Sequence, residues 1–113
     1  MRCSIGLGVA GSMALAVLAT SAAAKAEASD PARGKELAEG RCAACHNVAS
    51  GTQSSPKPEA PNFLAIANRA DQSADKLIWS LVFPPHPEMP DVPFSNNELR
   101  DISAYILSLR DQK

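Results

Sequence analysis

Residues 42–46 of this chain read Cys42-Ala43-Ala44-Cys45-His46, and this stretch determines how the rest of the sequence is interpreted. Two cysteines three positions apart share one face of a helical turn, and the histidine lies beside them. Two thiols placed in this way can form thioethers with the two vinyl groups of one porphyrin, while the imidazole is directed at its iron. The pattern therefore predicts covalent attachment of one haem c through Cys42 and Cys45, with His46 as an axial ligand of the iron.

Two other chemistries use a pair of cysteines at this spacing. A redox-active dithiol is expected within a βαβ unit, and the chain has no alternating run of strand length. A structural zinc site needs four ligands, usually in separated pairs, and only His86 could join this cluster. Haem attachment is favoured because it also requires the adjacent histidine and an export signal, and the sequence has both.

Residues 1–26 have the pattern of a secretory signal peptide. Arg2 precedes an apolar run over residues 5–19, and cleavage after Ala24 or Ala26 fits the small-x-small rule. A retained membrane anchor is the alternative, since the apolar run approaches the length of a span when the small residues after it are included. The small residues favour cleavage, which predicts export to the periplasm.

The predicted mature domain, residues 27–113, is small and acidic. Removing Arg2 and Lys25 from the eleven basic residues leaves nine against twelve acidic ones, a net charge of −3. This balance argues against nucleic-acid binding, which needs a basic patch. A core of this size is marginal alone, so the haem is expected to stabilise the fold as a large apolar plate. We expect a monomer with no membrane span.

The sequence predicts an all-α fold with three or more short helices joined by ordered loops. A first helix is capped by Asp30, has a proline at its first position and runs to about Gly40. A second helix begins near Ser73 and ends before Pro84. Its apolar residues recur at helical spacing and are Leu77, Ile78, Leu81 and Val82.

The last helix has the clearest start signal in the chain. Ser95 and Glu98 form a capping box, flanked by Phe94 and Leu99 as a hydrophobic staple. The stripe expected to be buried consists of Leu99, Ile102, Tyr105, Ile106 and Leu109. Residues 50–61 are rich in Ser, Pro and Gly, which predicts a loop.

These motifs and their order resemble the small, single-haem, class I cytochromes c of bacteria. The matching segments are Gly34-Lys35-x-Leu37, Cys42-Ala43-Ala44-Cys45-His46, Pro61-Asn62-Phe63, Met89-Pro90 and Ala104-Tyr105-Ile106. The resemblance implies a class I cytochrome c-like fold around one covalent haem. It also implies that the first and last helices cross at Gly34, facing Ile102 and Tyr105. The family commonly has an aromatic residue where this chain has Ala38, so we expect the crossing to pack differently here, with Tyr105 in the core.

Met89 is the predicted second axial ligand of the iron. Beyond the signal peptide it is the only methionine, and His86 is the only histidine besides His46. Prolines around Met89 stiffen its segment, and a Met/His pair is a standard arrangement in cytochromes c. The alternatives are that Met89 fills the core or that a loop shift presents His86 instead. The resemblance implies a surface histidine at position 86.

Further contacts of the haem site follow from the same resemblance. The carbonyl of Pro61 is expected to accept a hydrogen bond from the Nδ1–H of His46 and so to orient the ring. Arg69 and Trp79 are candidates to meet the haem propionates, since buried carboxylates need donors. The alternatives are a solvated charge at a helix end for Arg69 and half-buried core packing for Trp79.

The resemblance implies a periplasmic one-electron carrier that is not an enzyme by itself, because iron with both axial positions filled cannot bind substrate. We expect the haem edge to lie between Ala43, Ala44 and residues 83–92, where redox proteins would dock transiently through a mostly apolar contact. Two alternatives remain open. The chain could be the haem c subunit of a larger oxidoreductase, or a haem-based gas sensor or peroxidase-like protein with a labile sixth ligand.

Overall fold

The computed structural model describes residues 28–83 and 89–110, and within those ranges it contains four helices and no strand. The helices are α1 (Pro31–Arg41), α2 (Phe63–Ala67), α3 (Ala74–Val82) and α4 (Asn96–Ser108). The predicted all-α class is confirmed, and α1, α3 and α4 are the three helices expected from the sequence. The predicted signal peptide, residues 1–26, and His86 lie outside the described residues.

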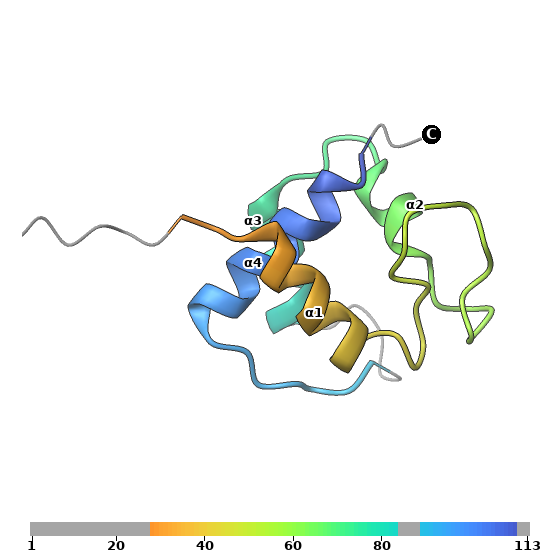
Figure 1. Cartoon of the computed structure of the whole chain (residues 1–113), viewed down its shortest axis with the longest axis horizontal. Coiled ribbons are helices and arrows are strands. Elements are labelled where there is room, and N and C mark those ends of the chain that lie inside the picture. The colour runs from red at the N-terminus through yellow and green to blue at the C-terminus, as the bar shows by residue number, and fades with distance from the viewer. Residues whose placement is uncertain (1–27, 84–88, 111–113) are drawn as a thin grey trace, which may run out of the picture.

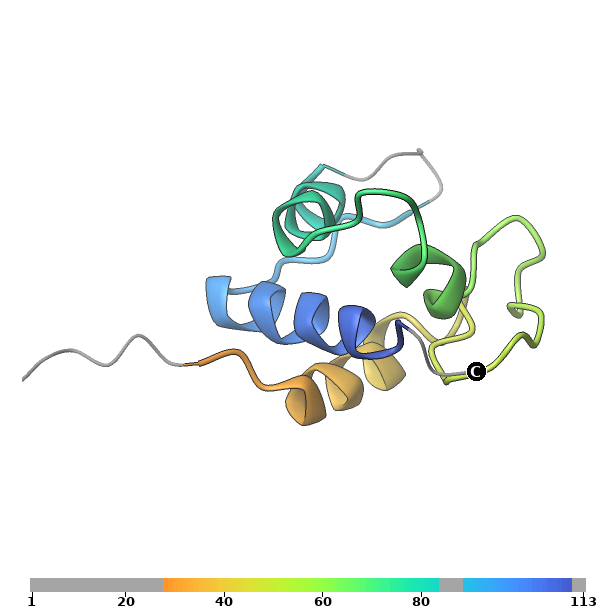
Figure 2. The ribbon, with the colours of Figure 1, turned by 90° about the horizontal axis from the view of Figure 1, so that it is seen from above.

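Helix α4 lies at the centre of the fold. It contacts each of the other three helices, most extensively α1. Figure 2 shows α4 between α1 on one side and α3 on the other, while α2 and the long loop over residues 47–61 lie toward one end (Figure 1). The segment after α1, the loop and α3 all contribute residues to the lining of two adjoining hollows.

The predicted start of α4 is confirmed in detail. The backbone N–H of Ser95 donates to Oε2 of Glu98 at 2.8 Å, and the backbone N–H of Glu98 donates to Oγ of Ser95 at 3.3 Å. Two backbone donors that the helix cannot satisfy internally are therefore paired by side chains. This capping box sets where the chain changes from the preceding extended segment into α4.

Helix α2 was not foreseen, because its five residues are too short to show a helical period. Its signal in the sequence is Asn62, whose side chain accepts a hydrogen bond from the backbone N–H of Ala65 at 2.7 Å. An asparagine at this position is a strong helix cap. The helix buries Phe63 and Ala67.

The crossing of α1 and α4 depends on small residues of α1. Gly34 and Ala38, one helical turn apart, are the buried residues of α1. A Cβ atom built on Gly34 would overlap the backbone carbonyl of Asp101 and approach Cβ of Tyr105 to 2.9 Å. The crossing at Gly34 and its approach to Tyr105 are thus confirmed, and the atoms nearest to the added Cβ belong to the backbone of Asp101. Ala38 is fully buried on the same face of α1. A short side chain therefore stands at the crossing where the family commonly has an aromatic residue.

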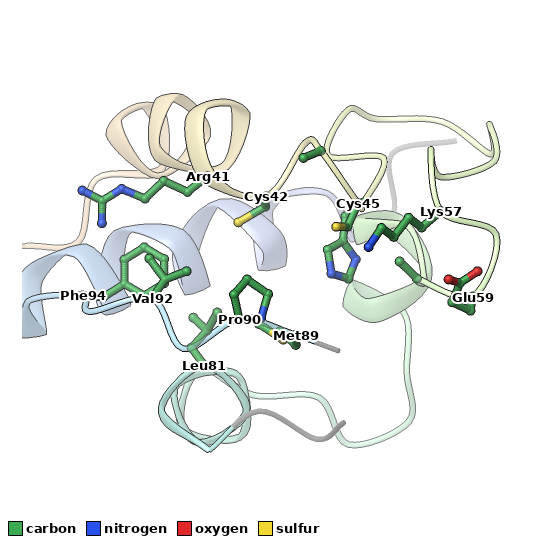
Figure 3. A pocket seen from close by; sticks show the side chains of 13 residues that line it. Arg41, Cys42, Cys45, Lys57, Glu59, Leu81, Met89, Pro90, Val92 and Phe94 are labelled. Carbon is green, nitrogen blue, oxygen red and sulfur yellow. The ribbon is translucent and has the colours of Figure 1, made fainter. Parts of the chain in front are cut away.

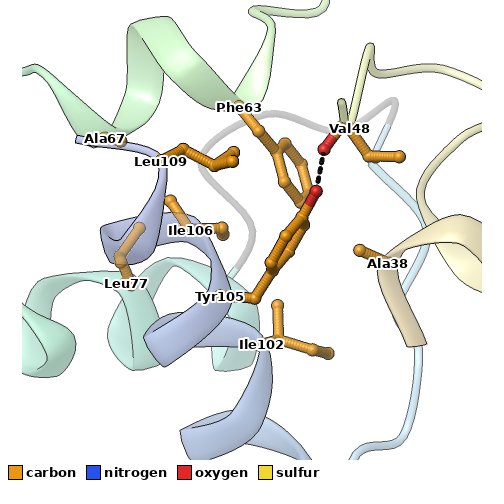
Figure 4. Packing of buried hydrophobic residues seen from close by; sticks show 9 residues of the cluster. All are labelled: Ala38, Val48, Phe63, Ala67, Leu77, Ile102, Tyr105, Ile106 and Leu109. Atoms are coloured by element: carbon orange, nitrogen blue, oxygen red, sulfur yellow. Dashed lines mark hydrogen bonds between the residues drawn. The ribbon is translucent and has the colours of Figure 1, made fainter. Parts of the chain in front are cut away.

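A small apolar core joins the helices to the loop (Figure 4). The buried cluster consists of Ala38, Val48, Phe63, Ala67, Leu77, Ile102, Tyr105, Ile106 and Leu109. Tyr105 is a core residue, as predicted, and its hydroxyl donates to the carbonyl of Val48 at 2.6 Å. This bond joins the loop that follows residues 42–46 to the C-terminal half of α4.

Candidate haem site

The two cysteines and the histidine lie on one turn that continues from α1. The helix ends at Arg41, and the backbone N–H groups of Cys45 and His46 both donate to the carbonyl of Cys42, at 3.1 and 2.9 Å. Both cysteines are free and partly buried. Because all three side chains line one hollow, the turn brings together the groups that the sequence predicted to act together.

The imidazole of His46 is oriented by a backbone carbonyl. Its Nδ1 lies 2.7 Å from the oxygen of Pro61. A carbonyl oxygen can only accept, so Nδ1 carries the proton and Nε2 keeps its lone pair for a metal. The ring of Phe63 packs beside the imidazole at a centroid distance of 5.6 Å. The predicted contact of Pro61 with His46 is therefore present in the structure.

Two adjoining hollows, which together we call the crevice, open beside this turn, and Figure 3 shows the residues that line the first of them. Their empty volumes are ≈ 780 and ≈ 900 Å³, and both figures include space open to solvent. Four residues line both hollows: Cys42, His46, Leu81 and Met89. The turn after α1, helix α3 and the segment leading to α4 thus enclose one space.

Met89 lies across the crevice from the cysteine turn. Figure 3 shows Met89 and Pro90 on the wall opposite Cys42, next to Leu81. Met89 is half-buried and lines the crevice, and it is not part of the buried core cluster. Met89 and His46 therefore line the same crevice, although they come from segments far apart in the sequence.

The surroundings of Cys42 differ from those of a reactive dithiol. Burial raises the pKa of the Cys42 thiol, Arg41 opposes this effect and Cys45 adds to it. Reactive cysteines have a lowered pKa because their environment stabilises the thiolate. A zinc site is also disfavoured, since no group of three His, Cys, Asp or Glu residues within the described part of the chain could hold a metal ion.

Arg69 and Trp79, the two candidates for propionate contacts, are placed differently. Arg69 is exposed but lines the second hollow. Trp79 lines neither hollow, is 65% exposed and stacks on Phe83 at a centroid distance of 4.8 Å. The alternative of half-buried core packing for Trp79 is therefore wrong, because the apolar face of α3 that packs inward carries Leu77 and Leu81 instead.

Several residues of the crevice were not singled out from the sequence. Besides Ala44 and Val92, which belong to the predicted haem edge, the residues lining the first hollow include Arg41, Lys57, Glu59 and Phe94, whereas Ala43 does not line it. Arg41 could have been noticed because it immediately precedes Cys42. Lys57 and Glu59 carry no such signal, since only the path of the loop brings them to the crevice.

The fold and the site define an all-α protein built to hold one haem covalently, and the comparisons with known proteins give the same class. The chain belongs to the cytochrome c family, whose model matches residues 31–110. It is 43% identical over 96 residues to cytochrome c-552 of Bradyrhizobium diazoefficiens, which covers 85% of this chain and 90% of that protein. No solved structure gives a significant match.

Membership of this family makes haem c the cofactor and electron transport the general role. The residues of the crevice fit that cofactor, because two free thiols, an imidazole with an available Nε2 and a thioether all line it. Its remaining lining is largely apolar, as a porphyrin plate requires. When bound, the haem supplies an iron that gains and loses one electron.

Proposed function

We propose that this protein is a periplasmic one-electron carrier. In this proposal Cys42 and Cys45 form the thioethers to the haem, and His46 and Met89 are the two axial ligands of its iron. The observation that supports it most is that both thiols, His46 and Met89 line one crevice, with Met89 across it from Cys42. Iron with both positions filled has no place for a substrate, which suits transfer and not catalysis.

The chain's own residues would keep these ligands in place during electron transfer. Pro61 fixes the ring of His46, and the bond from Tyr105 to Val48 holds the following loop to α4. The geometry of a site held in this way should change little between the two oxidation states of the iron. A small change in geometry favours fast electron transfer. The thioether of Met89 would stabilise the reduced iron and so raise its potential.

The exposed rim of the crevice is the proposed point of electron exchange. Ala44 and Pro90 are exposed there. Of the three described charged residues that line the first hollow, Lys57 and Glu59 have opposite signs and Arg41 is paired with Glu98 of α4. A rim without a dominant charge suits weak, mostly apolar contact with transient redox partners. We further propose that residues 1–26 are removed as a signal peptide and that residues 27–113 act as a monomer. In the described ranges, no helix is long and apolar enough to cross a membrane.

The test compares Met89→Ala with His86→Ala in the purified holoprotein. Met89→Ala should remove the weak near-infrared absorption band of ferric iron bound to sulfur, lower the potential and let the reduced protein bind CO. His86→Ala should leave all three properties unchanged. The reverse result would make His86 the ligand, and rapid CO binding by the unmodified protein would favour a sensor or peroxidase-like function. Persistent association with a larger complex, measured as native mass, would favour an oxidoreductase subunit.

A further inference from the structure

Arg41, the last residue of α1, contacts the segment that leads from Met89 to α4. Its Nη1 donates to the carbonyl of Pro93 at 3.4 Å, and its Nη2 donates to Oε1 of Glu98, also at 3.4 Å. Its guanidinium carbon lies 5.2 Å from the centre of the Phe94 ring. Figure 3 shows the side chain extending over Phe94 and Val92. One side chain thus reaches the backbone, an aromatic ring and a carboxylate of the same stretch of chain.

The segment 89–94 has few other attachments. It forms no helix, and no backbone-to-backbone hydrogen bond joins it to another described residue. Four of its residues line the first hollow: Met89, Pro90, Val92 and Phe94. Segments with few backbone hydrogen bonds open at low free-energy cost. The position of Met89 therefore depends on what holds the end of the segment near Pro93.

We propose that Arg41 is a positioning residue that holds segment 89–94 against the crevice and so controls how often Met89 leaves the iron. This inference rests on the proposed role of Met89 as axial ligand. Each contact of Arg41 is weak singly, because the two hydrogen bonds are long and the guanidinium is partly exposed. Together they join the turn that carries the cysteines to the segment that carries the methionine. The same arginine thereby connects the two opposite walls of the crevice.

The chain contains a matched control for this arginine. Arg33 also lies on α1 and pairs with an acidic residue of α4, with its Nε 3.5 Å from Oδ2 of Asp101. Arg33 lines neither hollow of the crevice. Replacing Arg33 therefore removes an ion pair between the same two helices without touching the segment of Met89.

The experiment compares Arg41→Gln, Arg41→Lys and Arg33→Gln in the oxidised holoprotein. The first measurement is the rate of imidazole binding to the iron at saturating imidazole, where departure of Met89 limits the rate. Arg41→Gln should raise this rate about tenfold, as expected from loss of several weak contacts to one segment. Arg33→Gln should leave it within about twofold. Arg41→Lys should lie between them, because an ammonium keeps the charge but cannot reach two acceptors in the same fork geometry.

A second measurement does not depend on the iron. Hydrogen exchange at the backbone amides of Asp91, Val92 and Phe94 should accelerate in Arg41→Gln and stay unchanged in Arg33→Gln. The double variant Met89→Ala/Arg41→Gln should bind imidazole no faster than Met89→Ala alone. Equal effects of Arg41→Gln and Arg33→Gln on the rate would overturn the inference, since Arg41 would then act only by joining α1 to α4. If Met89→Ala itself keeps the sulfur band, the ligand assignment fails instead, which is a separate result.

Discussion

The hydroxyl of Tyr105 shows how one polar atom positions a loop of the site. It is buried and donates to the carbonyl of Val48 at 2.6 Å, two residues after His46. A buried carbonyl without a partner is costly, so this bond does more than add to packing. The ring packs against Phe63, which in turn packs against the imidazole. A single tyrosine therefore connects α4 with the loop and the predicted ligand.

Tyr105→Phe should lower the free energy of unfolding by ~1–2 kcal/mol, because the ring stays while the Val48 carbonyl loses its donor. Chemical denaturation of the holoprotein measures the change. Ser108→Ala is a suitable comparison, since Ser108 lies on the exposed side of the same helix and its hydroxyl donates to a carbonyl of that helix. An equal or larger loss in Ser108→Ala would contradict a special role for the buried bond.

At the scale of elements, the pairing of α1 with α4 relies on close backbone approach and not on large side chains. Helix α1 presents Gly34 and Ala38 to its partner, whereas α4 supplies the bulky residues. Small residues one helical turn apart on the same face let the two backbones come close together, which increases the contact area between the helices. The orientation of the cysteine turn, which follows directly from the end of α1, depends on this crossing.

Gly34→Ala and Gly40→Ala should have opposite effects on stability, although both replace a glycine of α1. The added methyl at position 34 meets the backbone of Asp101, so the free energy of unfolding of Gly34→Ala should fall by about 1–3 kcal/mol or more. The same methyl at position 40 has no atom within 4 Å, so the free energy of unfolding of Gly40→Ala should rise by about 0.5–1 kcal/mol because alanine has the higher helix propensity. Thermal unfolding of both holoproteins provides the comparison. Similar melting temperatures in the two variants would contradict the close crossing.

The capping box makes the start of α4 sensitive to acid. Hydrogen bonds from the backbone and hydroxyl of Ser95 lower the pKa of Glu98, and Arg41 and Arg33 contribute to the same direction. A carboxyl whose pKa is lower in the folded state stabilises the fold above its unfolded pKa, about 4.3, and loses this effect as the pH falls through the folded value.

The free energy of unfolding of each protein should therefore be compared between pH 7 and a pH below about 4. We expect this free energy to fall less in Glu98→Gln than in the unmodified protein. The amide keeps the geometry of the box but cannot be protonated. Denaturation curves at pH 7 and at stepwise lower pH measure the difference. Parallel losses in the two proteins would show that other carboxyls account for the acid response.

At the scale of the whole molecule, the helices and the loop enclose a crevice that protein side chains do not fill. The buried core lies around α4, while the turn with the cysteines, α3 and segment 89–94 line the crevice. A domain of this size has little apolar surface to bury. Haem c in the crevice would supply the apolar contact that these elements lack between themselves.

The double variant Cys42→Ala/Cys45→Ala should consequently fail to form a stable fold. Without thioethers the haem should be lost, and circular dichroism should show reduced helix content with no sharp unfolding transition. In the unmodified protein, a denaturing gel stained for haem should show a band at the mass of the polypeptide. Haem that is extracted by acidified organic solvent from the unmodified protein would contradict covalent attachment.

The strongest local signals in the sequence correctly predicted the elements they mark. The capping box at Ser95 and Glu98, the cap at Asp30 and the apolar period of α3 each concern residues within one or two helical turns, and all three helices are present. The short helix α2 escaped detection because its five residues carry no period. Half-buried core packing was one expectation for Trp79, but its side chain is 65% exposed, because helical spacing alone did not show which face of α3 packs inward.

The sequence by itself determined the cofactor chemistry, because the two thiols and the imidazole lie within five consecutive residues and local geometry suffices to bring them together. Only the tertiary structure brought Met89 to the opposite wall of the same crevice, set Pro61 against the ring of His46 and placed Arg41 over Phe94. These contacts join residues from 15 to 53 positions apart, as between His46 and Pro61 or between Arg41 and Phe94. No local pattern in the sequence specifies contacts between residues so far apart along the chain. These contacts result from the close crossing of α1 and α4 and from the path of the loops around it.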